Sequence, residues 1–255
     1  MTNSTSAPVD ASAFDLTPEP ELANGSAALC LHGLTGTPYE MRPIAEALVA
    51  RGIRARGPVG AGHEEGPQLL AATPRGAWLD AARSEFEALR RDSERVFLVG
   101  VSMGGLLCLR LAQSARVDAL VVIGTPLVLP PPTPQLLPLL RRVMRFRKKH
   151  APDIQDPVAR ARHPGHRLTP LDAVAELIAL QGDVIPELAA ISAPILVAHG
   201  EKDRTARPAD AQRIHAEVGS RDKELFMLER SGHVVTVDYD GPALARAAAD
   251  FLGRR

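Results

Sequence analysis

The sequence predicts an α/β fold with a mostly parallel central sheet, helices on both faces and a small inserted cap. Short apolar runs of strand length alternate with longer stretches whose apolar residues recur at helical spacing. One long stretch, residues 126–190, interrupts this alternation, which then resumes to the end of the chain. Strands that alternate with helices pair in parallel, and right-handed connections place the helices on both faces of the sheet.

The first part of the chain predicts buried strands that alternate with helices. The strands are short, and all but 53–58, which contains two arginines, are apolar runs; most of them run into a turn that contains glycine. The stretches between them are amphipathic or apolar at helical spacing, and residues 60–68 predict a glycine-rich loop. The predicted strands are 27–31, 53–58, 95–100 and 117–124, and the predicted helices are 39–52, 73–92 and 103–113.

Residues 126–190 predict a cap. The proline run LPPPTP at 129–134 argues against a helix or a central strand, whereas 136–150 and 168–181 predict helices. Because this insertion follows the carboxyl end of a strand, we expect it to lie above the sheet edge where such folds bind ligands. The core is then 23–125 and 191–255, and its second part predicts strands at 193–200 and 223–228 and helices at 208–218 and 242–253.

The composition argues against several classes of function. Of 255 residues, 45% are apolar and 24% charged, and 30 Lys and Arg balance 30 Asp and Glu. This balance predicts no nucleic-acid partner, and no apolar run approaches the ~20 residues of a membrane span, so no stable membrane anchor is expected. Residues 1–22 are small, polar and acidic and do not resemble a signal peptide, so we expect a weakly ordered segment and a cytoplasmic protein.

Cys30 and Cys108 lie in apolar runs without partners at metal-site spacing, which predicts buried free thiols and no structural metal.

A Gly-x-Ser-x-Gly motif stands at residues 100–104, where a predicted strand turns into a predicted helix. In this context the sharp turn presents the serine hydroxyl at the carboxyl edge of the sheet, as a nucleophile requires. Glycine is needed on both sides because the backbone is crowded there. The alternative is a tight turn with a capping serine, which explains the glycines less well. We therefore predict Ser102 as the catalytic nucleophile.

A serine nucleophile needs a base and an acid that orients the base. His233 follows the predicted strand 223–228, so its loop lies at the same sheet edge as Ser102. Asp203 follows the strand 193–200, and the chain order serine, acid, histidine is the one that this kind of site uses. We therefore predict His233 as the base and Asp203 as the acid. The competing acids are Asp222, at the start of a strand, and Asp238 and Asp240, beyond the histidine.

Acyl transfer also needs backbone N–H groups that stabilise an oxyanion. The N–H of Met103 opens the helix after the serine, where the helix dipole favours negative charge. The second donor comes from the loop after the strand 27–31, and our candidate is the N–H of Leu34. A plain glycine turn is the alternative for this loop.

Four segments together resemble a known family: HGLTG at 32–36, GVSMGG at 100–105, GEKDRT at 200–205 and SGHVV at 231–235. They are similar to the small bacterial carboxylesterases and monoacylglycerol lipases of the α/β-hydrolase superfamily, and the resemblance covers about residues 27–252. It implies an α/β-hydrolase fold, a lipid-like or simple ester as the small-molecule substrate, and neither metal nor cofactor. It also implies that Leu34 and Met103 carry the oxyanion-binding N–H groups. The proline-rich and basic stretches of the cap are least like the family.

These residues predict a serine hydrolase that cleaves carboxylic esters, either short- to medium-chain acyl esters or monoacylglycerols, through an acyl-enzyme on Ser102. Other acyl chemistry on the same residues stays open, as in a thioesterase, peptidase, acyltransferase or perhydrolase. A third reading is a non-catalytic binding protein on the same fold. In the cap, Leu137, Leu140 and Met144 are candidates for an acyl-pocket wall; the alternative is a helix with one face on the core and a solvated basic face.

Overall fold

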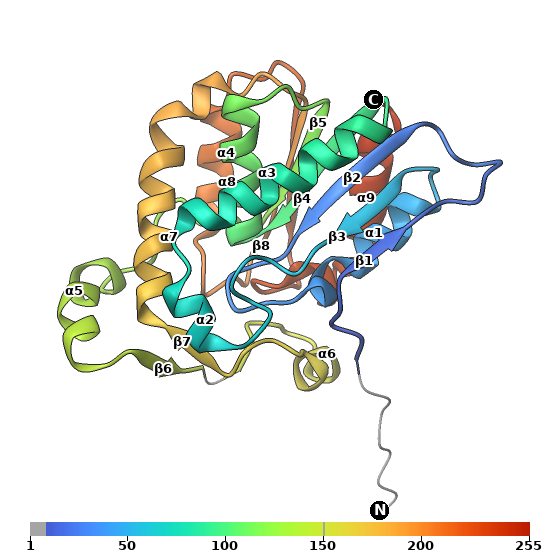
Figure 1. The fold of residues 1–255 in the computed structure, drawn as a ribbon. Coiled ribbons are helices and arrows are strands. Elements are labelled where there is room, and N and C mark those ends of the chain that lie inside the picture. Colours follow the sequence, from blue (N-terminus) through green and yellow to red (C-terminus); the bar gives the residue numbers. More distant parts are fainter. Residues whose placement is uncertain (1–8, 150) are drawn as a thin grey trace, which may run out of the picture.

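The computed structural model describes residues 9–149 and 151–255 (Figure 1). Seven of the strands form one sheet in the order β1-β3-β2-β4-β5-β8-β9. Every neighbouring pair is parallel except β1 with β3, which confirms the predicted mostly parallel sheet. The strands are β1 (Phe14–Leu16), β2 (Ser26–Leu31), β3 (Arg54–Gly57), β4 (Arg95–Val101), β5 (Ala119–Ile123), β8 (Ile195–Gly200) and β9 (Lys223–Leu228).

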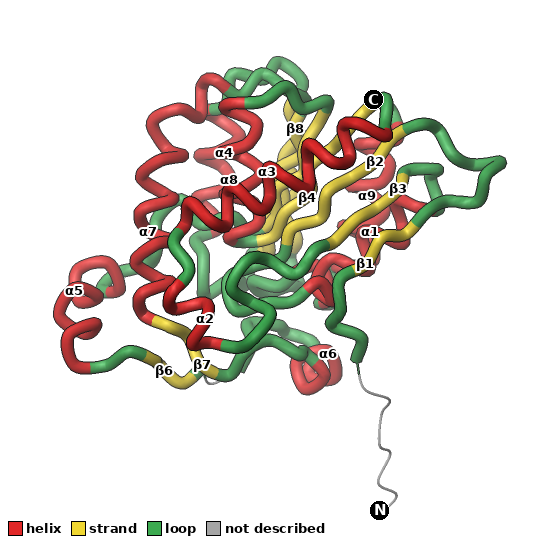
Figure 2. Tube along the Cα trace, in the orientation of Figure 1, coloured by secondary structure: helices red, strands yellow, loops and turns green. Residues whose placement is uncertain are grey.

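Helices cover both faces of the sheet, as predicted (Figure 2). Apolar residues of α1 and α9 form one core cluster with one face of the strands, and residues of α3, α4 and α8 form another with the opposite face. Neighbouring residues of β2 alternate between the two: Leu29 lies in one cluster and Cys30 in the other. The helices are α1 (Arg42–Val49), α3 (Arg75–Asp92), α4 (Met103–Ser114), α8 (Pro208–Glu217) and α9 (Gly241–Gly253).

Part of segment 1–22, which was expected to be weakly ordered, forms an edge strand of the sheet. Residues 1–8 lie outside the described part of the chain, but Phe14–Leu16 form β1 and pair antiparallel with β3. Phe14 is buried against β3, and Asp15 accepts hydrogen bonds from Arg54 and Arg56. The expectation was wrong for Phe14–Leu16. Three residues are too few to show a periodicity, and pairing with β3 orders them.

Between β5 and β8 the chain forms an insertion with its own two-stranded sheet. The helix predicted over 136–150 is wrong at both ends, since it begins inside the proline run and ends at Val143; residue 150 lies outside the described residues. Proline is tolerated in the first turn of a helix, where its missing N–H would be unpaired. Beyond Val143, pairing with a distant strand outweighs the local helical spacing. The elements are α5 (Thr133–Val143), β6 (Phe146–Lys148), α6 (Pro157–Arg162), β7 (Leu168–Pro170), α7 (Leu171–Val184) and the 3-10 helix η2 (Ile185–Ala190).

Helix α7 packs on the core as well as on the insertion. Its buried Leu177, Leu180 and Val184 belong to the same cluster as residues of α3 and α4, and Figure 1 shows α7 beside α4. The segment 126–190 therefore does not stand apart as one unit, because its last part is built into the layer that covers the sheet.

The entry to the insertion is tied to the core by a buried carboxylate. Asp210 of α8 is 1% exposed. It accepts hydrogen bonds from the N–H groups of Leu127 and Val128, in the loop that follows β5. A carboxylate is buried at tolerable cost only with such partners, so the contact fixes where the insertion leaves the core.

The loops at the carboxyl ends of the parallel strands contain three further short elements. These are η1 (Pro38–Met41), α2 (Pro67–Ala72), which begins inside the predicted loop 60–68, and η3 (Val235–Val237). In the part of the chain that the structure describes, no helix combines the length and apolar character that crossing a membrane requires. Cys30 and Cys108 are buried and free.

Candidate active site

Ser102 occupies the turn between β4 and α4. Its φ of 55° and ψ of −117° are rare for a residue that carries a side chain. The Ser102 N–H donates to the Ile123 carbonyl oxygen at 2.8 Å. A Cβ on Gly100 would lie 2.3 Å from the Gly104 oxygen, and a Cβ on Gly104 would lie 2.1 Å from the Leu31 oxygen. Both flanking positions therefore require glycine, and the strained turn presents the serine at the sheet edge.

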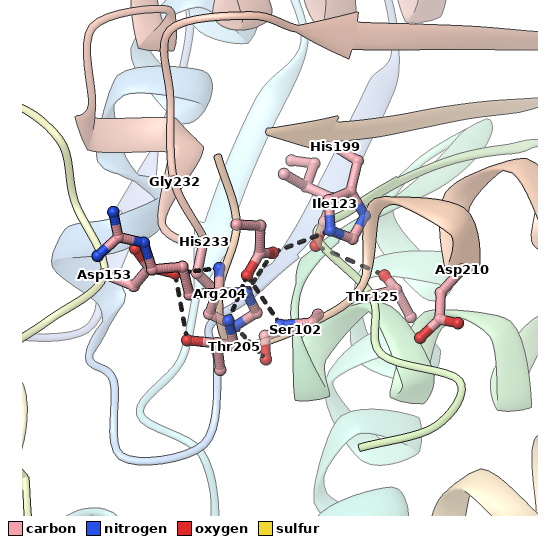
Figure 3. Close-up of polar contacts among 12 residues, drawn as sticks. Ser102, Ile123, Thr125, Asp153, His199, Arg204, Thr205, Asp210, Gly232 and His233 are labelled. Atoms are coloured by element: carbon pink, nitrogen blue, oxygen red, sulfur yellow. Dashed lines mark hydrogen bonds and ion pairs between the residues drawn. The ribbon is translucent and has the colours of Figure 1, made fainter. Parts of the chain in front are cut away.

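Three of the predicted side chains meet at this edge. His233 Nε2 lies 2.9 Å from Ser102 Oγ (Figure 3). His233 Nδ1 lies 2.7 Å from Asp203 Oδ2. The residues follow β4, β8 and β9, so the ends of parallel strands bring them together across up to 131 positions of sequence. An ionised carboxylate only accepts hydrogen bonds, so His233 carries its hydrogen on Nδ1 and leaves Nε2 free to accept the hydroxyl proton of Ser102.

Asp203 is a buried carboxylate surrounded by donors. The N–H groups of Thr205 and Ala206 donate to Oδ1 at 2.7 and 2.8 Å. The imidazoles of His233 and His199 lie 2.7 and 2.9 Å from Oδ2. Burial alone would raise the pKa of Asp203, but the charge of His233 and these polar contacts outweigh burial and lower the pKa. Asp203 is therefore ionised at neutral pH.

The pKa of His233 reflects opposed effects. Burial lowers it, whereas the charge and hydrogen bond of Asp203, and the charges of Asp153 and Glu40, raise it. The carboxylates prevail, so the pKa lies above the ordinary value of 6.5. A base with a raised pKa accepts a proton more readily, and the adjacent carboxylate stabilises the imidazolium that results.

His199 is a second histidine on the same carboxylate, and its place in the site was not predicted from the sequence. It ends β8, is 0% exposed, and its Nε2 lies 2.9 Å from Asp203 Oδ2 in a contact that is not a linear hydrogen bond. Among the described residues its Nδ1 has no hydrogen-bond partner. The one sign in the sequence is its position, four residues before Asp203 at the end of a strand.

The competing acids have other partners. Asp238 accepts hydrogen bonds from backbone N–H groups, among them that of Gly232 at 2.8 Å. Asp240 accepts from the Ser231 hydroxyl at 2.9 Å, and Asp222 lies directly before β9, at the opposite end of that strand from the histidine loop. Among these four carboxylates, Asp203 is the one that contacts the His233 imidazole.

The loop after β2 lies against Ser102. A Cβ on Gly33 would lie 3.2 Å from the Ser102 Cβ, so the loop backbone passes close to the serine. Within residues 9–149 and 151–255, the N–H groups of Leu34 and Met103 have no hydrogen-bond partner. Each belongs to a residue that directly follows one of this close pair. Unpaired N–H groups beside a serine hydroxyl are suited to donate hydrogen bonds to an oxyanion that develops there.

The insertion contacts this loop directly. Glu40 is buried and lies 2.8 Å from His163 Nε2. Burial would raise the pKa of Glu40, but the hydrogen bond and charge of His163 outweigh it and lower the pKa to about 2. The N–H of His166 donates to the Thr35 oxygen at 2.9 Å, and Lys149 Nζ donates to Thr35 Oγ1 at 3.2 Å. The backbone that carries Leu34 is therefore held from the insertion as well as from the core.

The three candidates for the acyl-pocket wall differ in exposure. Leu137 is 4% exposed and belongs to the core cluster that contains Met103. Leu140 and Met144 are 36% and 41% exposed. A cavity of about 440 Å³ in the insertion is lined by residues between 148 and 167 and by none of these three. In the described residues no group of three or more His, Cys, Asp or Glu side chains is arranged to hold a metal ion.

Known proteins share this sequence pattern. Residues 25–240 match the family described as serine aminopeptidase, S33. The thermostable monoacylglycerol lipase of Bacillus sp. (strain H-257) is 27% identical over 232 residues, which cover 89% of this chain and 90% of the relative. The carboxylesterase of Bacillus subtilis (strain 168) is 26% identical over 243 residues, which cover 93% of this chain and 97% of the relative.

The fold is shared with solved lipolytic enzymes. A structure from work on LipS and LipT, two metagenome-derived lipolytic enzymes, is 25% identical with a TM-score of 0.87, and the match covers 96% of this chain and 98% of that one. This agreement confirms the α/β-hydrolase fold. Because the family match spans most of the sequence, the chain belongs to the serine aminopeptidase S33 family of α/β-hydrolases.

Proposed function

We propose that this protein is a serine hydrolase that cleaves carboxylic esters through an acyl-enzyme on Ser102. The observation that carries the proposal is the row of contacts from Ser102 Oγ through His233 to Asp203, at 2.9 and 2.7 Å. A serine hydroxyl is a weak nucleophile and needs such a base as it attacks. The relatives named as a monoacylglycerol lipase and a carboxylesterase support an ester as the substrate.

Acylation begins when Ser102 Oγ attacks the ester carbonyl carbon and its proton passes to His233 Nε2. The carbonyl oxygen becomes an oxyanion, which accepts hydrogen bonds from the N–H groups of Leu34 and Met103. Asp203 stabilises the imidazolium without taking its proton. The tetrahedral intermediate then collapses, the bond to the alcohol oxygen breaks, and His233 gives its proton to the departing alkoxide.

Deacylation repeats these steps with water as the nucleophile. His233 removes a proton from water as the water oxygen attacks the acyl carbon of the Ser102 ester. The same N–H groups hold the second oxyanion. Collapse releases the carboxylic acid, and His233 returns its proton to Ser102 Oγ, so the enzyme regains its starting state.

Peptide hydrolysis is the second candidate, because the matching family is described as an aminopeptidase. An aminopeptidase must bind the free α-ammonium group of its substrate, and a carboxylate is the natural partner for that cation. The buried carboxylates near Ser102 already have partners: Asp203 is held by His233 and backbone N–H groups, and Glu40 by His163. This favours an ester over a peptide.

A matched panel of substrates tests the choice. It contains p-nitrophenyl esters from acetate to palmitate, 1-monoacylglycerols, aminoacyl p-nitroanilides and acyl thioesters, each measured with wild type and with Ser102→Ala. Product analysis with added glycerol and with hydrogen peroxide tests acyl transfer to acceptors other than water. We expect turnover of esters into free acid. Turnover confined to anilides or thioesters, or transfer in place of hydrolysis, would overturn the ester assignment.

We also propose that the insertion, residues 126–190, is the cap that selects the acyl part of the ester. Leu137, Leu140 and Met144 would then contact the acyl chain. Helix α5 carries large apolar side chains that are exposed to solvent, such as Leu139 at 62%. An apolar surface of this kind fits a fatty acyl chain better than a polar group. Each methylene buried there contributes up to about 0.8 kcal/mol, so the preference should rise with acyl length from acetate until the pocket ends, within the range of short- to medium-chain acyl esters or monoacylglycerols.

We further propose a cytoplasmic location, which the two thiols support. Cys30 and Cys108 are buried and unpaired with each other, and buried free thiols are usual in a reducing compartment. Cell fractionation followed by detection with an antibody against the protein tests this location. Recovery in the membrane or secreted fraction contradicts it.

A further inference from the structure

We propose that Asp153, in the insertion, is a positioning residue that holds the loops of Asp203 and His233 at the separation that the reaction needs. The inference rests on the proposed function, since it gives these two side chains a shared task. Asp153 lies between β6 and α6, in the segment that runs beside the site (Figure 3).

Asp153 holds the acid loop through its side chain. The N–H of Arg204 donates to Asp153 Oδ2 at 2.7 Å, and the Thr205 hydroxyl lies 3.4 Å from the same oxygen. Both residues directly follow Asp203. The N–H of Thr205 also donates to Asp203 Oδ1 at 2.7 Å, so the two carboxylates hold one short turn between them.

Asp153 also holds the histidine loop, through its backbone. The N–H of Val234 donates to the Asp153 carbonyl oxygen at 3.2 Å. A Cβ on Gly232 would lie 2.7 Å from that oxygen and 2.8 Å from Asp153 Oδ1, so the glycine backbone packs directly against Asp153. Gly232 and Val234 flank His233, and one residue of the insertion therefore contacts the neighbours of both the acid and the base.

The segment does not depend on the Asp153 side chain for its attachment. Asp238 is buried, and its carboxylate accepts hydrogen bonds from the N–H groups of Gln155 and Asp156 at 2.7 and 2.8 Å, together with that of Gly232. This second set of bonds keeps the insertion on the histidine loop when Asp153 is changed. A substitution at Asp153 therefore alters the acid loop and the local charge more than it alters the fold.

Asp153 also adds to the negative charge around His233. Burial lowers the pKa of His233, while the carboxylates of Asp203, Asp153 and Glu40 raise it. Removing the charge of Asp153 should therefore lower the pKa of His233. The acid limb, which is the part of the pH–rate profile where activity falls as His233 becomes protonated, should then move to lower pH. A residue that merely stabilised the fold would change the melting temperature and leave that limb in place.

The test uses the full chain with three substitutions: Asp153→Ala, Asp153→Asn and the control Asp156→Asn. Asparagine keeps the size of Asp153 and one acceptor oxygen, but removes the charge. Asp156 lies in the same segment, and its carboxylate accepts hydrogen bonds from the N–H groups of Val158 and Ala159 at the start of α6. The readouts are the rate at which a fluorophosphonate labels Ser102, and kcat and KM for a p-nitrophenyl ester, each across pH.

Asp153→Ala should label Ser102 and turn over ester about ten- to a hundredfold more slowly than wild type, with the loss in kcat, because small displacements of reacting groups cost rate. Asp153→Asn should lose less and show its acid limb at lower pH. Asp156→Asn should match wild type. The inference is overturned if folded Asp153→Asn keeps both the wild-type rate and the wild-type limb; this variant decides the matter if Asp153→Ala does not fold. Failure to label Ser102 in wild type would instead refute the proposed function.

Discussion

Replacing Asp203 by asparagine tests its proposed role as the orienting acid with almost no change of shape. Asp203 Oδ1 accepts hydrogen bonds from the backbone N–H groups of Thr205 and Ala206, and Oδ2 lies against the imidazoles of His233 and His199. An asparagine side chain has one acceptor oxygen and one NH2 donor. The asparagine NH2 group must therefore face either the two backbone N–H groups or the ring N–H of His233, and in both cases two donors meet.

The two orientations of the amide differ in free energy. If the NH2 group faces Thr205 and Ala206, two buried backbone donors lose their acceptor, at a cost of about 1–3 kcal/mol each, or roughly 2–6 kcal/mol together. If it faces His233, the ring avoids the conflict by moving its hydrogen from Nδ1 to Nε2. That tautomer presents an N–H to Ser102 and cannot accept the serine proton. Since about 1.4 kcal/mol is a tenfold change, kcat should fall by roughly 30-fold to 10⁴-fold.

The assay compares kcat for a p-nitrophenyl ester in wild type, Asp203→Asn and the control Asp240→Asn, with circular dichroism and thermal melting of each. Asp240 accepts hydrogen bonds from the Arg230 N–H and the Ser231 hydroxyl at the base of the histidine loop. It should tolerate the same chemical change with little effect on kcat. Two results would refute the reasoning: a wild-type kcat in Asp203→Asn, or an equal loss in the control.

The remaining predictions concern the nucleophile, the base and the insertion. Ser102→Ala should fold normally, lose nearly all ester turnover and no longer react with a fluorophosphonate; labelling at another serine would contradict the assignment. In wild type, kcat/KM should rise with pH through one ionisation above the ordinary value of 6.5, since the carboxylates raise the pKa of His233 and only its neutral form accepts a proton; a limb well below that value would argue against this base. EDTA should leave ester turnover unchanged, and loss of activity that a metal restores would argue against the scheme. Leu137→Ala should shift the preferred acyl length and lower the free energy of unfolding by about 2–5 kcal/mol, whereas Leu140→Ala and Met144→Ala should shift acyl length alone, because both are more exposed. Unchanged acyl-length profiles in all three would place the acyl site elsewhere.

The sequence predicts the core of this fold well because its signals are local. Most core strands, such as β2, β4, β5 and β8, are short apolar runs, and each core helix shows its own spacing. The placement of Ser102, Asp203 and His233 followed from the same logic, since each lies in the turn or loop after a predicted strand and parallel strands end at one edge.

What the sequence did not predict depends on partners that are distant along the chain. β1 forms because β3 is beside it, and β6 forms because β7 returns to pair with it. His199 and Asp153 carry no motif, and their contacts with Asp203 and its loop exist only once β8 and the insertion are in place. Leu140 and Met144 belong to the same apolar pattern as the buried Leu137, but Leu140 lies on an exposed side of α5 and Met144 lies just beyond its end, so both stay exposed.

The two attachments of the insertion define a segment that could be exchanged between homologous enzymes. Val128 is fixed at one end by Asp210, and α7 is fixed at the other by its packing on α3 and α4. A graft that joins foreign sequence after Val128 and before Leu171 would leave both junctions on rigid elements. The transplanted segment must still supply an equivalent of Asp153, because the loop that follows Asp203 donates a hydrogen bond to that carboxylate. A chimaera built in this way should acquire the substrate range of its donor while it keeps the host's thermal stability.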